Sequence, residues 1–346
     1  MKSIHLVGSV PLNDSGEVFE TLCHAIGPYL HRIPDGETGV RSGWIGFQHT
    51  MLESHPAVML DPNGRKVPIR DLKGGVSREN HLFVINPAID ESEINFLPLG
   101  YAQAALDSFA IFQQKEAAGV IPPNMRFQVC LPTPFATGLL YFHPHAQIQY
   151  IHLMKQALLT EMLEICATIP HHKLAIQWDC CQEILLIEDY FPEDWSYDVA
   201  NLLPTLGELG DAVPDGVELG FHLCYGSPVD EPLVVQEDMQ VVVDFANQIS
   251  ASVKRSVQFM HLPVSDPLAD DRFFAPLGQL KLPADTELYV GLVNPRDPEG
   301  DERRIQLAQK YYPNFGIATE CGWGRKELAQ MIPLLTEHQN AIEAMS

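Results

Sequence analysis

The stretch VELGFHLC at residues 217–224 shows the pattern that decides the fold. It is a short, mainly apolar run without the alternation of a strand exposed on one face, so we expect both of its faces to be buried. Seven further runs of this kind occur at residues 4–8, 30–33, 126–131, 174–179, 257–262, 287–293 and 315–320. Helical patterns lie between and after them, for example at residues 146–169, 239–253 and 325–344. Repeated strand–helix units imply a parallel sheet, and eight such units favour an α/β fold of the single (β/α)8 TIM barrel type over an open sheet.

The run from about residue 46 to residue 123 interrupts this regular spacing. It is too long for one crossover helix, so we expect an excursion between the second and third strands of the barrel. Within it, Asn63-Gly64 supplies the positive φ of a tight turn and predicts a small hairpin over residues 58–69. Apart from this insertion, residues 1–346 are expected to form one barrel domain.

Charge and composition exclude several classes of protein. The chain carries 22 Lys and Arg against 45 Asp and Glu, and its formal net charge of −23 disfavours nucleic acid as a partner. No apolar run approaches the roughly 18–20 residues of a membrane span, and the first residues lack a secretory signal pattern. The seven cysteines are thinly spread and do not resemble a secreted disulfide framework. We therefore expect a cytoplasmic protein without a membrane partner, and no feature of the sequence specifies an oligomeric state.

The active site of such a barrel lies at the carboxyl ends of its strands. His222 and Cys224 stand two residues apart on one predicted strand, so their side chains point to the same face and can hold one ion together. Cys321 and His261 stand at the ends of two other strands. Thiolate and imidazole in a tetrahedral set select zinc, and a catalytic zinc keeps one position open. These four residues therefore predict a zinc site, while the alternative that the His-x-Cys pair is only part of the core stays open.

Four of the predicted strands end in polar motifs, namely Gly8-Ser9, Gln177-x-Asp179, His222-x-Cys224 and Glu-Cys-Gly around Cys321. Together these motifs resemble the catalytic barrel of cobalamin-independent methionine synthase, and the resemblance covers nearly the whole chain. Those enzymes carry a second, N-terminal barrel. The chain therefore resembles a single-barrel relative within the wider superfamily that includes uroporphyrinogen decarboxylase.

The resemblance implies a zinc-dependent activity. In that family a His, a Glu and two Cys bind zinc, which holds the sulfur of homocysteine as a thiolate for attack on a methyl donor. His222, Cys224 and Cys321 match three of these ligands, and His261 stands where the family has its Glu.

The resemblance also assigns roles beyond the metal. Asp179 matches the Asp that holds the homocysteine amino group, and Ser9 lies in a matching motif. Asn294 stands where the family has a catalytic His; an amide forms hydrogen bonds but does not act as an acid. Catalytic roles are therefore expected for Asp179, His261 and Asn294, and substrate binding for Ser9 and Asp179.

Other polar residues near the strand ends are weaker candidates for substrate binding. Glu37 and Arg41, after the second strand, suit an amino group and a carboxylate, although a salt bridge that caps a helix is the more common role of such a pair. Trp44 is expected to line the pocket, with ordinary packing at the start of a helix as the alternative. Arg296 is the preferred anion clamp because a guanidinium forks onto carboxylate or phosphate, with pairing to the acidic residues at 297–302 as the alternative.

Three functions remain compatible with the sequence. The first is zinc-dependent transfer of a methyl or other alkyl group to a small thiol such as homocysteine. Because the second barrel is missing, its donor need not be a folate. The second is a lyase or decarboxylase on the same barrel that needs no thiol, and the third is a non-catalytic protein that binds a metal or a small molecule. Only the transferase requires both zinc with an open position and a thiol-dependent product.

Overall fold

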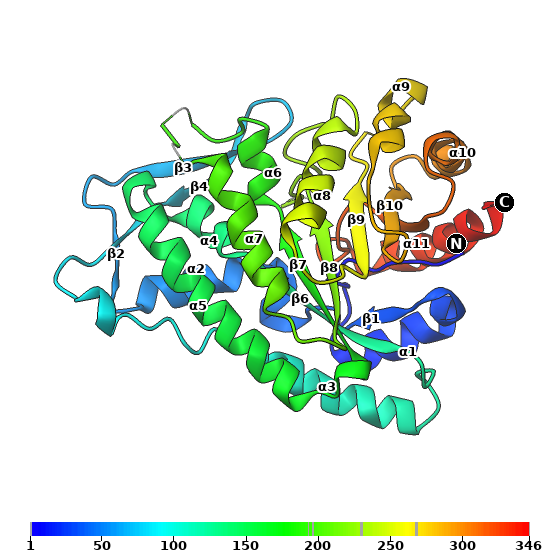
Figure 1. Ribbon diagram of the computed structural model, residues 1–346, viewed down its shortest axis with the longest axis horizontal. Coiled ribbons are helices and arrows are strands. Elements are labelled where there is room, and N and C mark those ends of the chain that lie inside the picture. Colours follow the sequence, from blue (N-terminus) through cyan, green and yellow to red (C-terminus); the bar gives the residue numbers. More distant parts are fainter. Residues whose placement is uncertain (1, 193, 196, 229–230, 267–268, 346) are drawn as a thin grey trace.

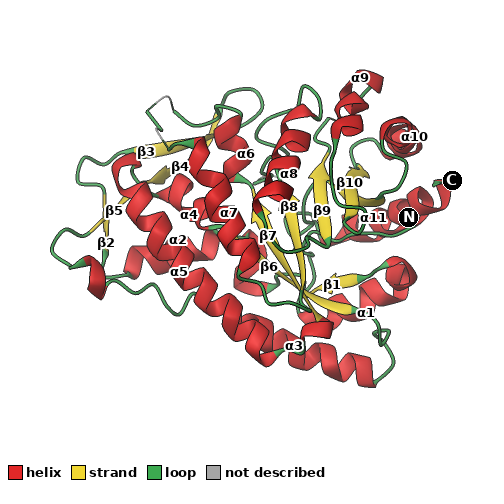
Figure 2. Ribbon diagram, in the orientation of Figure 1, coloured by secondary structure: helices red, strands yellow, loops and turns green. Residues whose placement is uncertain are grey.

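Parallel strands form one seven-stranded sheet in the computed structural model, which describes residues 2–192, 194–195, 197–228, 231–266 and 269–345. Neighbours in the sheet follow the order of the chain: β1 (Arg32–Pro34), β6 (Arg126–Pro132), β7 (Leu174–Cys180), β8 (Glu218–Leu223), β9 (Phe259–Pro263), β10 (Glu287–Val293) and β11 (Gly316–Thr319). Nearly every residue of these strands is buried, which explains their continuous apolar runs. Figure 2 shows the strands side by side with helices around them.

A segment near the start of the chain joins the two edges of this sheet. Ile4 makes parallel bridges to Leu30, which precedes β1, and to Ile317 in β11. The Ile4 N–H donates to the Tyr29 carbonyl at 2.9 Å, and the His5 N–H donates to the Ile317 carbonyl at 2.9 Å. The segment takes the place of an eighth strand, and the predicted barrel is confirmed.

Helices cover the outside of the barrel. The helices predicted at residues 146–169 and 239–253 are α5 (Pro144–Thr168) and α8 (Gln240–Ser252). The others are α1 (Ser15–Ile26), α2 (Gly46–Ser54), α3 (Tyr101–Ala117), α4 (Pro134–Tyr141), α6 (Gln182–Ile187), α7 (Leu202–Asp211), α9 (Asp271–Phe274), α10 (Asp301–Tyr311) and α11 (Leu328–Ala344). In the part of the chain that the structure describes, no helix is long and apolar enough to cross a membrane.

The excursion between β1 and β6 contains α2, α3 and four short strands, and its hairpin differs from the predicted one. β2 (Val58–Leu60) pairs with β5 (Phe83–Ile85), and β3 (Lys66–Arg70) pairs with β4 (Val76–His81). Asn63-Gly64 turns the chain as expected, with Gly64 at a φ of 66°, but it connects β2 to β3, which are not partners. The hairpin predicted over residues 58–69 is therefore wrong, and the actual one is the β3–β4 hairpin.

Local side-chain chemistry explains where that hairpin turns. The Asp71 carboxylate accepts the backbone N–H groups of Lys73 at 2.9 Å and of Gly75 at 2.8 Å. An aspartate that binds the backbone of the residues after it stabilises a turn. The chain therefore reverses at residues 71–75.

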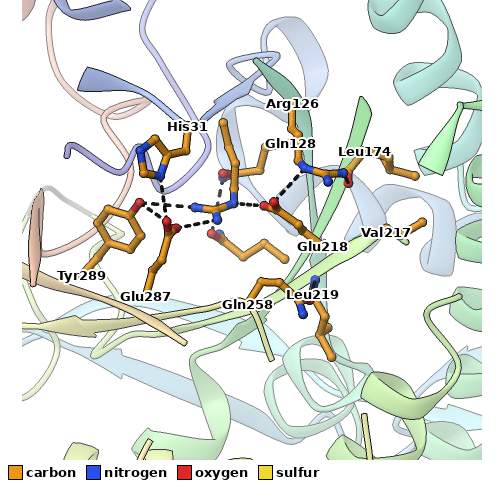
Figure 3. Close-up of polar contacts among 12 residues, drawn as sticks. His31, Arg126, Gln128, Leu174, Val217, Glu218, Leu219, Gln258, Glu287 and Tyr289 are labelled. Carbon is orange, nitrogen blue, oxygen red and sulfur yellow. Dashed lines mark hydrogen bonds and ion pairs between the residues drawn. The ribbon is translucent and has the colours of Figure 1, made fainter. Parts of the chain in front are cut away.

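The amino ends of the strands are closed by a cluster of ion pairs (Figure 3). The buried Arg32 donates from Nε to Glu218 at 2.5 Å and from Nη2 to Glu287 at 2.6 Å. Each carboxylate has a second basic partner: Arg126 lies 2.7 Å from Glu218, and His31 lies 2.8 Å from Glu287. Burial opposes ionisation of Glu287, but His31 and Arg32 outweigh it and lower its pKa to about 2.

Candidate metal and substrate site

The opposite end of the barrel holds a cavity of about 230 Å³. Neighbouring strands bring polar residues to one level there, because Asp179 is in register with His222, and His222 is in register with His261. Seven of the predicted site residues line the cavity: Ser9, Glu37, Trp44, Asp179, His222, Cys224 and Cys321.

Three of these side chains form a group that can hold a metal ion. Ligand atoms of His222, Cys224 and Cys321 all lie within 4.8 Å of one another, and the two sulfur atoms are 3.4 Å apart. A tetrahedral zinc with Zn–S bonds of about 2.3 Å sets its sulfur atoms about 3.8 Å apart, so shifts of a few tenths of an ångström suffice. The residues therefore fit zinc, with one imidazole and two thiolates on the wall of the cavity.

His261 lies behind His222 rather than beside it as a ligand. The Nε2 of His261 lies 3.0 Å from the carbonyl oxygen of Thr319, and a carbonyl only accepts, so this nitrogen carries the proton. Burial holds the pKa of His261 well below its usual range, so the ring is neutral and its Nδ1 is an acceptor. The Nδ1–H of His222 therefore donates to His261 Nδ1 at 2.7 Å.

This hydrogen bond gives His261 another role than the predicted one of a fourth ligand. Both of its ring nitrogens contact protein groups, and among the described residues the group that could hold a metal consists of His222, Cys224 and Cys321. The effect of His261 is to fix the tautomer of His222, which leaves the lone pair of His222 Nε2 available for a metal. Histidine ligands commonly donate their other N–H to an acceptor in this way.

Contacts among the cysteines favour one ionised sulfur. The hydrogen bond from the Cys224 thiol holds the pKa of Cys321 well below its usual range, and His222 and Arg325 act in the same direction against burial. Contacts with Cys181 and Cys321, together with burial, raise the pKa of Cys224. Cys181 also lines the cavity, so a third thiol lies beside the metal group.

Two carboxyl groups face the same cavity. Burial, with the charge of Glu37 adding to it, raises the pKa of Asp179 well above its usual range, although Gln177 donates a hydrogen bond to Asp179 at 2.8 Å. Burial and the nearby Asp35 raise the pKa of Glu37 to about 8, against the opposing charge of Arg41. A cationic group placed between Glu37 and Asp179 would restore both negative charges.

Backbone geometry aims Glu37 into the cavity. Gly36 has a φ of 82°, and a Cβ there would meet a methyl carbon of Val18 at 2.6 Å, so only glycine fits. Glu37 itself has a φ of 47°, a left-handed conformation that non-glycine residues adopt at some cost. The carboxyl group reaches the first loop, where its Oε1 would lie 3.1 Å from a Cβ on Gly8.

Ser9 joins the first and last loops around the metal group. Its carbonyl accepts the Trp323 N–H at 2.7 Å, and its Oγ accepts the Gly324 N–H at 3.1 Å. A Cβ on Gly322 would approach that Oγ to 2.4 Å. The glycines on either side of Trp323 therefore let the loop that carries Cys321 close against Ser9.

Three other predicted site residues form ion pairs or hydrogen bonds with protein groups. Arg41 donates to Asp35 at 2.5 Å, in a salt bridge of the kind considered as its alternative role. Arg296 pairs with Glu320 at 3.1 Å rather than with the acidic residues at 297–302. The Asn294 side chain accepts from the backbone N–H of Arg296 at 3.0 Å.

These contacts place Asn294 and Arg296 outside the main cavity. Both line a separate space of about 20 Å³ next to Cys321. The predicted role of Asn294 in catalysis and that of Arg296 in substrate binding stay predictions.

Arg325 is the site residue that the sequence missed most clearly. It lines the cavity, donates to Ser227 at 2.6 Å and lies 3.4 Å from the Cys321 sulfur, while its buried Nε has no hydrogen-bond partner among the described residues. The sequence placed it in a helix starting at residue 325. A capping box of Glu327 and Gln330 starts α11 three residues later, which leaves Arg325 in the loop over the cavity.

Comparison with known proteins identifies the fold. No protein-family model matches the chain, and no curated protein matches it. The B12-independent methionine synthase from Shewanella sp. W3-18-1, in complex with selenomethionine, aligns over 99% of this chain and 96% of its own, with a TM-score of 0.60 and 13% identity. A candidate vitamin B12-independent methionine synthase from Listeria monocytogenes aligns over 96% of this chain and 87% of its own, with a TM-score of 0.51 and 15% identity. The chain thus has the barrel fold of these proteins across nearly its full length.

Proposed function

We propose that this protein is a zinc-dependent transferase that moves a methyl or other alkyl group to the sulfur of a small amino thiol such as homocysteine. One observation carries the proposal: the group formed by His222, Cys224 and Cys321 opens onto a cavity that also holds the carboxyls of Glu37 and Asp179. A thiol that binds beside the sulfurs brings its amino group within the reach of those carboxyls.

His222, Cys224 and Cys321 would hold the zinc ion, and His261 would orient His222. Zinc in a site of this kind lowers the pKa of a thiol that binds it, so that the sulfur is ionised near neutral pH. In this proposal His261 is occupied by its own hydrogen bonds, so three protein ligands would leave a fourth tetrahedral position free for the thiol. This count suits catalysis rather than a purely structural metal site.

The remaining cavity residues suit an amino acid. Glu37 and Asp179 offer negative charge to an ammonium group, which removes the cost of keeping two carboxyls close together in a buried space. Arg325, whose buried Nε has no hydrogen-bond partner among the described residues, offers a donor to the carboxylate of the same substrate. Trp44 provides an aromatic wall beside Asp179.

The Shewanella structure supports this choice of substrate. That protein is in complex with selenomethionine, an amino acid that carries a methyl group on its chalcogen atom. A product of the same shape, with sulfur in place of selenium, is what methyl transfer to homocysteine would leave in the cavity of this protein.

The first test is the metal and its response to a thiol. We expect about one zinc per chain after purification without added metal, measured by elemental mass spectrometry, and loss of that zinc in Cys224→Ser. Cys23→Ser, a change of the same kind in α1 and away from the cavity, should keep its zinc. In cobalt-substituted protein, homocysteine should add thiolate-to-cobalt absorption, because a further sulfur enters the coordination sphere.

The second test is the reaction. Zinc-loaded protein with homocysteine and a panel of methyl donors should form a thioether, detected by mass spectrometry, in a thiol-dependent manner. A product that forms without thiol would favour the lyase. Full occupation of four metal positions by protein groups would favour a protein that only binds metal.

A further inference from the structure

The β3–β4 hairpin is positively charged in a strongly acidic protein. Residues 65–78 hold five of the 22 basic residues of the chain and only one acidic residue, Asp71, although Asp and Glu total 45. Figure 1 shows β3 and β4 at the upper end of the view, toward which the arrowheads of β8, β9 and β10 point. The basic segment therefore lies at the end of the barrel that carries the cavity.

Arg78 is the basic residue of this hairpin that reaches the cavity. It lies on the exposed strand β4 and lines the cavity together with Ile69 of β3. It is also close enough to Tyr141 and His49 to act on their ionisation. Arg78 therefore stands at the outer wall of the cavity, away from the metal group.

None of the described residues neutralises the charge of Arg78. Arg65 pairs with Asp194 at 2.6 Å and Lys66 pairs with Glu79 at 3.3 Å, but the Arg78 guanidinium makes neither a hydrogen bond nor an ion pair with any described residue. An arginine that is held at a cavity wall without an internal partner is available to an anion from solution.

The cavity connects Arg78 with the metal group. His222, Cys224 and Cys321 line it at one place, Arg78 lines it at another, and apolar side chains such as Leu140 and Leu185 line it as well. An alkyl donor whose transferred carbon lies at the metal group can therefore extend along these apolar side chains and place its far end at Arg78.

We propose that Arg78 binds an oxyanion of the second substrate, so that the alkyl donor carries a carboxylate or phosphate group some distance from the carbon that it transfers. This proposal rests on the proposed transferase function, because it assigns Arg78 to the donor. Arg78 is a specificity residue in this scheme: it fixes the far end of the donor and takes no part in breaking the bond to the alkyl group.

The test compares anion binding in the zinc-loaded protein with homocysteine present. Pyrophosphate and citrate serve as the phosphate and carboxylate probes, and isothermal titration calorimetry measures their dissociation constants. We expect at least one probe to bind about tenfold more weakly to Arg78→Ala, because a charge-assisted contact is lost. The probe that responds more strongly identifies the oxyanion. Lys73→Ala, which removes a charge at the tip of the same hairpin, should bind both probes like the unmodified protein.

The outcomes separate this proposal from the proposed function. If Arg78→Ala binds both probes as the unmodified protein does, or if Lys73→Ala weakens them equally, the Arg78 site is refuted, whatever the metal does. If homocysteine gives no thiolate-to-cobalt absorption, the transferase is refuted, while an Arg78-dependent probe still supports the anion site. Since Arg78 is exposed, its truncation should leave the melting temperature unchanged, which circular dichroism checks.

Discussion

The two ends of the barrel use charge in opposite ways. At the amino ends, the buried Arg32 lies between Glu218 and Glu287, and each carboxylate also has a second basic partner (Figure 3). At the carboxyl ends, Glu37 and Asp179 share a cavity in which burial disfavours their charges. Removing one partner of a buried ion pair destabilises the fold, so paired charges indicate a structural role. Ionisable groups that lack a sufficient opposite charge in a cavity are instead candidates for binding a ligand. On this ground we interpret the amino end as structural and the carboxyl end as the proposed binding end.

The largest expected effect is that of Cys321→Ser at the binding end. A serine hydroxyl is a poor zinc ligand, so zinc content should fall to less than about a tenth and alkyl transfer by more than about a thousandfold. The melting temperature of the metal-free proteins should be unchanged. Zinc and activity that both survive the substitution would show that the ligand assignment is wrong.

At the structural end, Arg32→Met should act on stability alone. It leaves Glu218 and Glu287 without their shared buried partner, and the free energy of unfolding should fall by about 3 kcal/mol. Denaturant unfolding measures this change, and the zinc content of the folded protein should stay at its original value. Lys66→Met, which breaks the exposed pair with Glu79, is the control and should cost less than about 1 kcal/mol. If the free energy of unfolding fell by a similar amount in both variants, the buried ion pairs of Arg32 would contribute no more to stability than an exposed pair.

An intermediate effect is expected from the histidine behind the metal group. His261→Leu removes the acceptor that fixes the tautomer of His222, so zinc affinity should fall about 10- to 100-fold in competition with a chelator. His261→Gln retains an amide oxygen as acceptor and should recover part of that loss. If the two variants lose affinity equally, the hydrogen bond does not position His222.

The smallest effect is a pair of opposite pH dependences. Glu287 has its folded pKa lowered to about 2, so its contribution to stability is present above the usual carboxyl range and is lost as the pH falls toward 2. Glu37 has its folded pKa raised to about 8, so its contribution is present below the usual carboxyl range and is lost as the pH rises through 8.

Unfolding curves of the two glutamine variants test these signs. The free energy of unfolding of Glu287→Gln near pH 7 should be lower by about 1 kcal/mol than that of the unmodified protein. This is less than the pKa shift alone would give, because Glu287 is partly exposed and solvent screens its ion pairs. Glu37→Gln should gain stability relative to the unmodified protein as the pH rises toward 9. Equal signs for the two variants would contradict the contrast between the two ends.

The sequence predicts well what strand geometry controls. Buried runs without alternation identify the strands, and the two-residue spacing of His222 and Cys224 puts both side chains on one face. Asp179 and Cys321 stand at the carboxyl ends of two other predicted strands. Because all strands of a parallel barrel end on the same side, both residues were expected beside His222 and Cys224. Position along a strand was therefore enough to bring the metal group and Asp179 to one cavity.

The position of a residue along its strand does not predict its contacts with other strands and loops. Whether His261 binds the metal or His222 depends on the register of β8 against β9, and the sequence contains no direct sign of that register. Arg325 was missed because a capping box moves the start of α11 by three residues. The hairpin was predicted at the wrong place because Asn-Gly is a typical hairpin turn. Here Asn63-Gly64 connects two strands that are not partners, since β2 pairs with β5.

The two cysteines of the candidate metal group lie far apart in the sequence, and we expect this distance to delay the completion of the group during folding. Cys224 and Cys321 are separated by 97 residues, and the second of them follows β11, which docks between β10 and the segment at Ile4. Closing so long a loop is slow compared with forming local helices. The metal group is therefore complete only when the ring of strands closes. In refolding experiments, the colour of bound cobalt should then report when that ring closes.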